Sequence, residues 1–274
     1  MPELPEVEAT RRRIVPAMVR RRFVSVDVRR PDLRAPFPTR FAKRLAGQTV
    51  LELTRRGKYL VAFLSSGEIL LIHLGMSGSL RIARATTVAP RDPHDHVIFH
   101  MSSARIVVFN DPRRFGLMDL IPAGHLERHR ALGRLGPEPL SGDFDAARLA
   151  RACRGKKTSL KAALLDQRVV AGLGNIYVSE ALHVAGLSPR RRASTLATPS
   201  GAPRDAAFRL ATAIKQVLER AIARQTARDD AYRASPFLVY EREGERCRTR
   251  NCGGTIRRRV EGGRSTFYCP VCQR

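Results

Sequence analysis

The sequence lacks several features that would place it in common classes of protein. It has no run of about 18 apolar residues, which excludes a membrane-spanning helix. Its first residues, MPELPEVEATRRR, contain no apolar segment, so we expect no secretory signal peptide. Apolar residues still make up 43% of the 274 residues. That share is enough to bury a core, so the chain is not disordered as a whole.

Acidic residues are scarce. The chain has 25 Asp and Glu against 50 Lys and Arg, a formal net charge of +25, and only six of the 50 are Lys. Such a charge predicts a partner that is a polyanion: DNA, RNA or an anionic membrane. An Arg-rich coding composition would raise the Arg content, but it does not explain why acids are half as numerous as bases. Guanidinium groups bind phosphate bidentately, which favours contacts to a nucleic-acid backbone.

The first part of the chain alternates between apolar segments and short turns. Its first 20 residues predict a helix that Pro16 breaks or kinks. Short strands follow, separated by turns rich in Gly, Ser, Asp and Pro, a pattern typical of a β-sandwich or barrel-like domain. The predicted strands are 24–28, 50–56, 59–64, 68–74, 96–101 and 105–110.

The pattern changes near residue 130, where LGPEPLSGDF has the composition of a linker. Four helical stretches follow, and the tail from about residue 237 returns to short strands. We therefore predict an α+β multidomain fold with a β domain (1–130), a helical domain (131–236) and a small cysteine module (237–274). The predicted helices are 144–154, 158–167, 176–186 and 205–225.

Four of the five cysteines lie near the C-terminus with the spacing C-x4-C-x16-C-x2-C. Four thiolates on two turns are the ligand set of a structural Zn²⁺, and TIRRRVEGGRSTFY between them predicts a hairpin with a Gly-Gly turn. The alternative is two disulfides or free thiols, but nothing indicates export to an oxidising compartment. Cys153 stands apart and is expected to be a small buried helix residue. The predicted zinc ligands are Cys247, Cys252, Cys269 and Cys272.

The N-terminus offers reactive groups. Removal of Met1 would leave Pro2 with a free secondary amine, a nucleophile able to attack a sugar C1′ and form an iminium. Glu3, beside it, could move protons. Taken alone, these residues are a weak signal, because a Pro at position 2 usually marks an ordinary processed terminus.

Eight segments, the last of them part of the cysteine hairpin, occur in one order along the chain. Together they resemble the formamidopyrimidine-DNA glycosylase family from residue 2 to residue 273. The resemblance implies a two-layer β-sandwich with an N-terminal helix, a helix–two-turn–helix domain and a zinc finger. It also implies one structural Zn²⁺ and double-stranded DNA containing oxidised bases or abasic sites as the partner, and we expect a cytoplasmic, nucleoid-associated monomer. The segments are MPELPEVE, RRGKYL, HLGMSGSL, HDHV, NDPRRFG, LGPEPL, GLGNIY and GRSTFYC.

The resemblance implies roles for five residues. Pro2 would form the Schiff base with C1′ of the damaged nucleotide, and Glu3 would donate a proton as the deoxyribose opens. Lys58 would donate a proton or hold phosphate during β-elimination. Arg264 would contact phosphate and assist δ-elimination, and Glu6 is expected to have a supporting role.

Other matched positions would contact DNA. The base must leave the stack before Pro2 can reach C1′, so Met76, Arg113 and Phe115 would fill the gap. In isolation Met76 and Phe115 would be ordinary core residues, but glycine-flanked turns predict exposed tips. Four residues match phosphate-contact positions: His94, Arg114, Lys157 and Asn175.

Two of these positions have other interpretations. Asn175 could be the N-cap of a helix that begins near Ile176, a position that also binds anions. The cluster of His94, Asp95, His96 and His100 could suggest a second metal site. Alternate residues of a strand point to opposite faces, so a structural or phosphate-contacting role is expected instead.

The sequence departs from the family in two places. The first finger knuckle is C-x4-C where the family usually has two residues between the cysteines, which predicts a distorted but metal-binding knuckle. The family's glycine-rich loop over the flipped purine is replaced by the shorter RQTARDDAYRASPFLVYEREGERC, which has no Gly before Gly244. The cap that reads the lesion is therefore expected to be reduced or altered.

Three functions are compatible with these sequence features. The leading one is a bifunctional DNA glycosylase and AP lyase for 8-oxoguanine and formamidopyrimidines. The second is an endonuclease VIII-like relative for oxidised pyrimidines or abasic sites, which the short cap permits. The third is a non-catalytic zinc-finger protein that binds damaged DNA. Pro2, Glu3, Lys58 and Arg264 together argue against the third.

Overall fold

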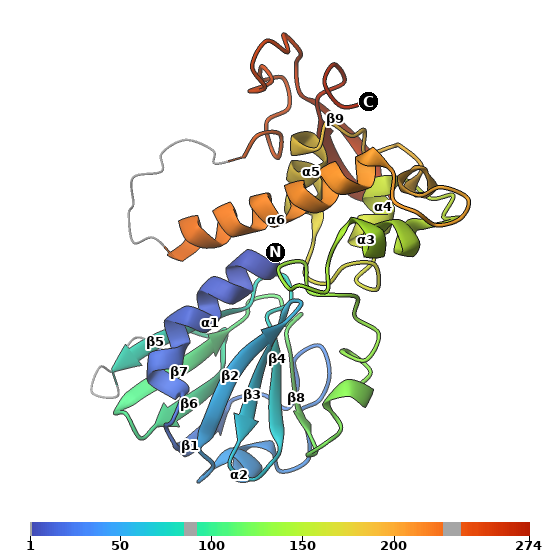
Figure 1. Cartoon of the computed structure of the whole chain (residues 1–274). Helices are drawn as coiled ribbons and strands as arrows, with labels where there is room; N and C mark the ends of the chain where they lie inside the picture. The colour runs from blue at the N-terminus through green and yellow to red at the C-terminus, as the bar shows by residue number, and fades with distance from the viewer. Residues whose placement is uncertain (1, 85–91, 227–236) are drawn as a thin grey trace. The chain divides into compact units, whose positions relative to one another are not determined.

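The computed structural model describes residues 2–84, 92–226 and 237–274. The chain forms two compact units, one ending at Gly133 and one beginning at Arg134 (Figure 1). The first is mainly β and the second mainly helical, followed by a β-hairpin. Within the described residues, no helix combines the length and apolarity needed to cross a bilayer.

The first unit contains two four-stranded antiparallel sheets. One has the strand order β2-β3-β4-β8 and the other β1-β6-β7-β5. The strands are β1 (Phe23–Val28), β2 (Val50–Arg56), β3 (Tyr59–Leu64), β4 (Ile69–His73), β5 (Ser79–Arg84), β6 (Asp95–Met101), β7 (Arg105–Asn110) and β8 (Leu117–Ile121).

The core of this unit draws side chains from both sheets and from the first helix. Leu60 and Ile72 come from one sheet, and Phe99 and Phe109 from the other, and all four are almost completely buried. Alternation of apolar and polar residues favours such two-layer packing, because each strand then offers one face to the core. The predicted β-sandwich is confirmed.

Helix α1 (Leu4–Met18) contacts strands of both sheets (Figure 1). Its apolar stripe is buried, with Leu4, Ile14 and Met18 fully covered. Pro16 lies inside the helix, which ends two residues later. Pro16 therefore lies in the last turn of the helix, near the point where the helix ends, and not at a break in its middle.

Four short elements of this unit were not predicted. Strand β5 carries two Arg among six residues, and the short segment β8 follows a Pro- and Gly-containing turn. Helix α2 (Phe41–Leu45) has five residues, too few to display a helical period. A short 3₁₀ helix, η1 (Leu126–Arg128), follows β8.

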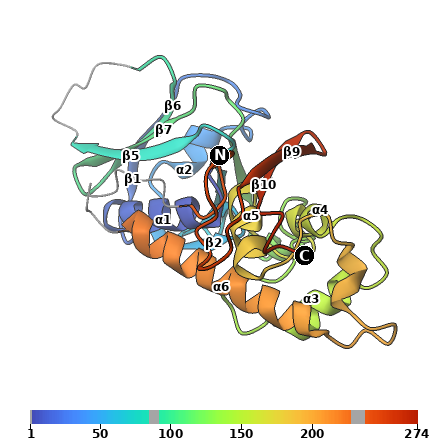
Figure 2. The ribbon, with the colours of Figure 1, turned by 90° about the horizontal axis from the view of Figure 1, so that it is seen from above.

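The second unit is built around a long amphipathic helix. Helix α6 (Asp205–Thr226) buries Ala and Leu residues at helical spacing and packs against α5 (Asn175–Val184), as Figure 2 shows. Three smaller helices complete this part: α3 (Ala146–Cys153), α4 (Leu160–Leu165) and the 3₁₀ helix η2 (Ala193–Leu196). All four predicted α-helices are present, with ends that differ by at most two residues.

The C-terminal hairpin also belongs to this unit. Strands β9 (Arg257–Glu261) and β10 (Arg264–Tyr268) pair antiparallel around Gly262 and Gly263, and β10 contacts α5. Both glycines have positive φ (55° and 72°), as the predicted Gly-Gly turn requires. The carboxylate of Glu180 in α5 accepts backbone N–H groups from residues 238–240 at 2.8–2.9 Å. These bonds anchor the segment that enters the hairpin module.

A buried carboxylate ties α1 to the sheet. Glu8 is 8% exposed, and its oxygens lie 2.8 Å from Arg11, 2.8 Å from Arg12 and 3.4 Å from Arg55 of β2. Burial alone would raise the pKa of Glu8, but hydrogen bonds from Arg11 and Arg12 and the charge of Arg55 lower it to about 2.

We expect Glu8→Gln to lower the free energy of unfolding at pH 7 by about 1–3 kcal/mol, because it removes charge-assisted hydrogen bonds. The folded-state pKa lies below the ordinary value of 4.5, so the stabilisation is complete above pH 4.5 and disappears as the pH falls towards 2. Urea unfolding at pH 7 and pH 3 measures it, with Glu52→Gln on the exposed face of β2 as the control. A difference between wild type and Glu8→Gln that does not change with pH would contradict this account.

Candidate active site and metal centre

The predicted nucleophile and its neighbour lie at the start of α1. Glu3 is the N-cap of this helix and only 1% exposed, whereas Pro2 is partly exposed. Glu6 and Glu3 form a capping box, in which the Glu6 carboxylate accepts the backbone N–H of Glu3 at 2.9 Å. These contacts fix the backbone immediately after Pro2. Met1 lies outside the described residues.

Lys58 occupies a two-residue hairpin turn. Gly57 has φ of 57°, and the register closes at the pair Arg56 and Tyr59. Burial, and then the charges of Lys58 and Arg34, lower the pKa of His73 to about 4. His73 is therefore neutral at pH 7, and its Nδ1 accepts the backbone N–H of Gly75 at 3.0 Å.

The predicted void-filling residues lie on two turns of the first unit. Met76 is 42% exposed and Phe115 is 44% exposed, so the expectation that they are exposed tips is confirmed. The guanidinium of Arg113 lies 4.7 Å from the centre of the Phe115 ring, a cation–π distance. The two turns are in contact, because a Cβ placed on Gly75 would lie 2.4 Å from the backbone carbon of Phe115.

Arg114 and His94 are exposed in the same unit. Arg114 has φ of 56°, in the left-handed region, and lies 3.6 Å from Asp32. The ring of His94 meets that of His96 edge-on at 6.4 Å.

The neighbouring histidines have protein partners. His96 is buried and its Nε2 bonds to the carbonyl of Asp111 at 2.9 Å, while His100 bonds to Asp27 at 2.9 Å. Among the described residues, the cysteine cluster alone has the geometry to hold a metal. The suggestion of a second metal site at the histidines is therefore not supported.

Asn175 does not cap helix α5. The helix begins at Asn175 and its N-cap is Gly174, so the predicted Asn N-cap is wrong. The Asn175 amide instead donates to the carbonyl of Ser265 in β10 at 2.9 Å. The sequence did not predict this bond to Ser265, because a polar residue at the start of a helix usually predicts a cap. Lys157 is exposed in the loop between α3 and α4.

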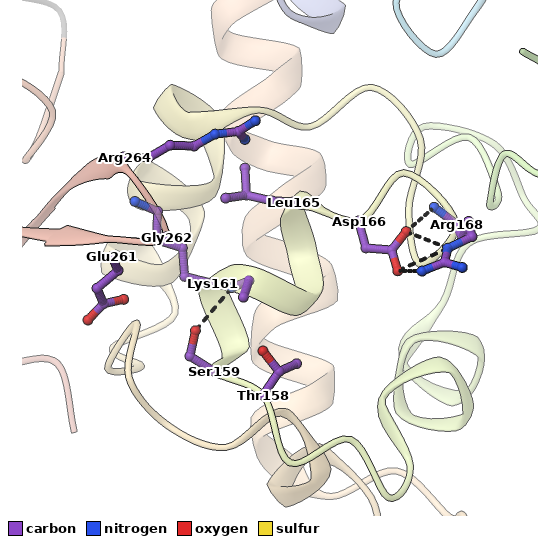
Figure 3. A pocket seen from close by; sticks show the side chains of 10 residues that line it. Thr158, Ser159, Lys161, Leu165, Asp166, Arg168, Glu261, Gly262 and Arg264 are labelled. Carbon is purple, nitrogen blue, oxygen red and sulfur yellow. Dashed lines mark hydrogen bonds and ion pairs between the residues drawn. The ribbon is translucent and has the colours of Figure 1, made fainter.

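Arg264 lines a pocket of about 680 Å³ between α4 and the hairpin (Figure 3). Lys161 from α4 reaches the hairpin, where its ammonium donates to the Ser265 carbonyl at 2.9 Å and to the Thr266 hydroxyl at 2.6 Å. Burial lowers the pKa of Lys161 to about 8, Glu261 opposes this shift and Arg264 adds to it.

Sequence reasoning missed Lys161. It is only 2% exposed and lies among the buried residues of a short apolar helix. A lysine at such a position is a signal, since buried lysines are rare unless they have partners. Its two hydrogen bonds hold β10, the strand that carries Arg264.

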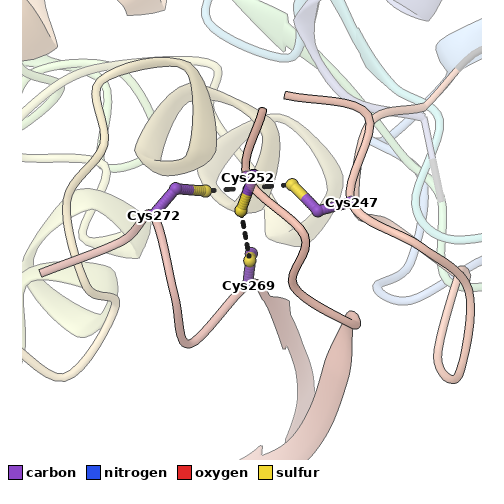
Figure 4. Close-up of side chains that lie close together, drawn as sticks. All are labelled: Cys247, Cys252, Cys269 and Cys272. Carbon is purple, nitrogen blue, oxygen red and sulfur yellow. Dashed lines mark hydrogen bonds between the residues drawn. The ribbon is translucent and has the colours of Figure 1, made fainter. Parts of the chain in front are cut away.

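The four predicted zinc ligands converge (Figure 4). Their sulfur atoms all lie within 4.8 Å of one another, with Cys252 and Cys269 3.5 Å apart and Cys247 and Cys272 3.8 Å apart. A tetrahedral site with Zn–S bonds of about 2.3 Å has sulfurs about 3.8 Å apart, so the cluster fits zinc. A disulfide needs about 2.05 Å, so the disulfide alternative is wrong. The longer first knuckle still brings its two cysteines into the site.

Other residues complete this module. His183 of α5 is buried beside the cluster, 4.0 Å from the sulfurs of Cys247 and Cys272. Val239, Ile256 and Phe267 form a small apolar core with Cys269. The module is therefore held by a metal site and only a few apolar side chains.

Cys153 lies in α3, apart from the zinc site. It is fully buried, as expected, and burial raises its pKa to about 11. A thiol with that pKa is inert at neutral pH.

Three family models match successive parts of the chain. The formamidopyrimidine-DNA glycosylase N-terminal domain matches residues 1–118 and the formamidopyrimidine-DNA glycosylase H2TH domain matches residues 135–230. The zinc finger found in FPG and IleRS matches residues 244–274.

Curated relatives match over their full length. A formamidopyrimidine-DNA glycosylase of Bradyrhizobium sp. (strain BTAi1 / ATCC BAA-1182) is 58% identical over 293 residues, covering 100% of both chains. One from Rhodopseudomonas palustris (strain BisA53) is 56% identical over 293 residues with the same coverage.

Solved structures agree. The Lactococcus lactis formamidopyrimidine-DNA glycosylase bound to DNA with an AP site has a TM-score of 0.86 and 32% identity, covering 99% of each chain. MutM with DNA containing carbocyclic 8-oxo-G has a TM-score of 0.87 and 32% identity, covering 100% of each. MutM of Thermus thermophilus has a TM-score of 0.81 and 38% identity, covering 99% of this chain and 98% of the other.

Proposed function

The chain belongs to the formamidopyrimidine-DNA glycosylase family, and on that premise we propose that the amine of Pro2 is its nucleophile. The protein is a DNA glycosylase with AP lyase activity that removes oxidised purines from DNA in base excision repair. It binds DNA and carries one structural zinc ion.

The proposed chemistry begins at Pro2. Once Met1 is removed, the secondary amine attacks C1′ of the damaged nucleotide, the bond to the base breaks, and opening of the sugar leaves an iminium. Glu3 donates the proton that the sugar oxygen takes up. The observation that carries this proposal is the buried Glu3 carboxyl held by a capping box directly beside Pro2.

Two cationic residues act in the elimination steps. Lys58, in its two-residue turn, donates a proton or holds phosphate as the 3′-phosphate leaves in β-elimination. Arg264, exposed on the zinc hairpin and supported through Lys161, contacts phosphate and assists δ-elimination. Zinc supplies no reactive group here; its four ligands Cys247, Cys252, Cys269 and Cys272 hold the hairpin that carries Arg264.

Exposed side chains do the DNA binding. Met76, Arg113 and Phe115 fill the gap that the everted nucleotide leaves, since a methionine and an aromatic ring can enter a base stack and a guanidinium can pair with the orphaned base. His94, Arg114 and Lys157 contact phosphates, which supply affinity without sequence information.

Asn175 is the least direct of the proposed phosphate contacts. An amide nitrogen has two N–H donors, so the bond to Ser265 leaves one for a phosphate. The same bond links the start of α5 to the hairpin, so loss of Asn175 also loosens β10.

We further propose three functional domains, 1–130, 131–236 and 237–274, in a monomer that works in the cytoplasm at the nucleoid. The first carries Pro2, Glu3 and Lys58, and the last carries Arg264.

A second candidate function differs from the first in the lesion that the enzyme removes. Residues 227–236 of the altered capping segment lie outside the described residues. The 293-residue alignments to relatives exceed the 274 residues of this chain, so those relatives carry residues that it lacks. Because the capping segment departs from the family in sequence, an endonuclease VIII-like preference for oxidised pyrimidines or abasic sites is the alternative.

Borohydride trapping on three duplexes separates these functions. We expect a covalent adduct on 8-oxoguanine opposite C, because the purine-branch residues Met76, Arg113 and Phe115 are present. An adduct only with thymine glycol opposite A or an abasic site would favour the alternative. No adduct on any duplex, with DNA binding intact and Pro2 confirmed free, would contradict amine catalysis.

A further inference from the structure

We infer that Asp111, acting through Ser77, is a positioning residue that holds the two turns bearing Met76, Arg113 and Phe115 in the shape needed to enter the base stack. The inference rests on the proposed function of those three side chains. Asp111 touches neither substrate nor a reacting atom in this account; it acts through the two turns.

Asp111 follows β7 directly and is fully buried. One carboxylate oxygen accepts the backbone N–H of Gly116 at 2.7 Å, and the other accepts the hydroxyl of Ser77 at 2.5 Å. The first bond closes the turn that contains Arg113 and Phe115. The second crosses to the turn that contains Met76.

The backbone of Asp111 is fixed as well. Its N–H donates to the carbonyl of His94 at 3.0 Å, and its carbonyl accepts the N–H of Arg114 at 3.1 Å and a bond from His96 Nε2 at 2.9 Å. A buried carboxylate is costly unless hydrogen-bonded, so these contacts specify one conformation rather than a range.

Ser77 links both turns through one atom. Its hydroxyl donates to Asp111 and accepts the backbone N–H of Arg113 at 3.2 Å. Ser77 follows Met76 in the chain, so the direction of the Met76 turn and the start of the Arg113 turn depend on the same oxygen. At the other end of the Met76 turn, neutral His73 accepts the N–H of Gly75.

The backbones of the two turns are also packed directly against each other. A Cβ on Gly75 would lie 2.4 Å from the backbone of Phe115, and a Cβ on Gly116 would lie 2.6 Å from the Phe109 ring. Gly75 further has φ of 64°. Neither turn can therefore shift without displacing the other, and the hydrogen bonds of Asp111 and Ser77 fix the positions of both.

Rigid turns matter because the side chains they carry are exposed. A free side chain that must enter a base stack loses rotamer and backbone entropy, and a pre-set turn removes the backbone part of that cost beforehand. The carboxylate therefore contributes to the step in which the base leaves the stack, and not to the breaking of bonds.

The test is Asp111→Asn. Asparagine has the same size but replaces one acceptor with a donor, which then faces Ser77 or Gly116. We expect single-turnover excision of 8-oxoguanine from duplex DNA to fall about tenfold or more, as loss of a buried hydrogen bond predicts. Cleavage of a preformed abasic site, where no base has to be evicted, should stay within about threefold, close to the spread of neutral substitutions.

A fluorescent base beside the lesion reports the step itself. With 2-aminopurine next to 8-oxoguanine, wild type should give a fast rise in fluorescence as the stack opens, and Asp111→Asn a slower or smaller one. Ser77→Ala, which leaves the buried carboxylate intact, should have the same effect and decides the question if Asp111→Asn does not fold. The double variant should lose less than the sum of the two single losses, because both act through one bond.

Asp119→Asn is the matched control. The carboxylate of Asp119 in β8 also accepts a backbone N–H, that of Leu120 at 2.9 Å, and lies 3.2 Å from Nε2 of His129. Asp119 lies in neither of the two turns. It should leave the excision-to-lyase ratio and the fluorescence change as in wild type.

The outcomes are separable. If wild type excises and Met76→Ala impairs excision, while folded Asp111→Asn and Ser77→Ala behave as wild type, the inference is overturned and the proposed function stands. Normal excision by Met76→Ala, Arg113→Ala and Phe115→Ala would overturn both the void-filling roles and the inference. No excision by wild type would contradict the proposed function itself.

Discussion

Pro2→Gly should lower excision of 8-oxoguanine by about 100-fold while leaving part of the lyase activity on abasic DNA, because a misplaced reacting group costs that much. Glycine still offers an N-terminal amine, so an imine can form at an open abasic aldehyde. It lacks the ring that fixes φ, and so the amine is no longer aimed by the helix that begins at Leu4. A primary amine also gives an imine that needs protonation, whereas proline gives a cationic iminium directly.

Single-turnover excision and abasic-site cleavage measure the two activities. Pro5→Ala is the matched control, since it changes a proline in the first turn of the same helix and leaves the terminal amine in place. It should lower stability slightly and keep both activities. Wild-type excision by Pro2→Gly would remove Pro2 from the nucleophile's role.

Cys269→Ser should release the zinc, unfold the finger and weaken DNA binding while the N-terminal sandwich stays folded. Cys269 is both a ligand and part of the small core of the module, so little remains to hold the hairpin once the metal is lost. Seven Arg and one acid lie between Cys247 and Arg274. We expect affinity for duplex DNA to fall about tenfold or more, and the salt dependence to flatten by about one unit of slope for each phosphate that the finger no longer neutralises.

Fluorescence anisotropy at several salt concentrations and a zinc assay make this measurement. Cys153→Ser is the control, because that cysteine is also fully buried but lies in α3, outside the metal site. It should keep its zinc and its affinity. Unchanged binding by the metal-free Cys269→Ser variant would remove the finger from the DNA contact.

The sequence predicted the parts of the fold that have a clear period. Strands β2, β3 and β7 were predicted with their observed limits, and β6 within one residue, because apolar β-branched runs stand between turn residues. Strand β5 was missed since two of its six residues are Arg, and α2 since it is barely longer than one turn. Their structure comes from packing against neighbours rather than from their own residues.

The candidate site divides in the same way. Pro2, Lys58 and the cysteines could be found because they stand in short motifs or at ligand spacing. Lys161 and Asp111 were missed, because their roles arise from contacts 104 and 34 residues away, with Ser265 and Ser77. A charged residue considered alone predicts a solvent-exposed position, and only the folded chain provides the partners that bury it.

The most direct test of amine catalysis is to locate the covalent bond. The wild-type protein, with removal of Met1 confirmed by mass, is trapped with borohydride on 8-oxoguanine DNA, digested, and the modified peptide sequenced by mass spectrometry. The account predicts the sugar remnant on the nitrogen of Pro2, in the peptide that begins PELPEVEATR. An adduct on Lys58 or another lysine, with Pro2 unmodified, would contradict it.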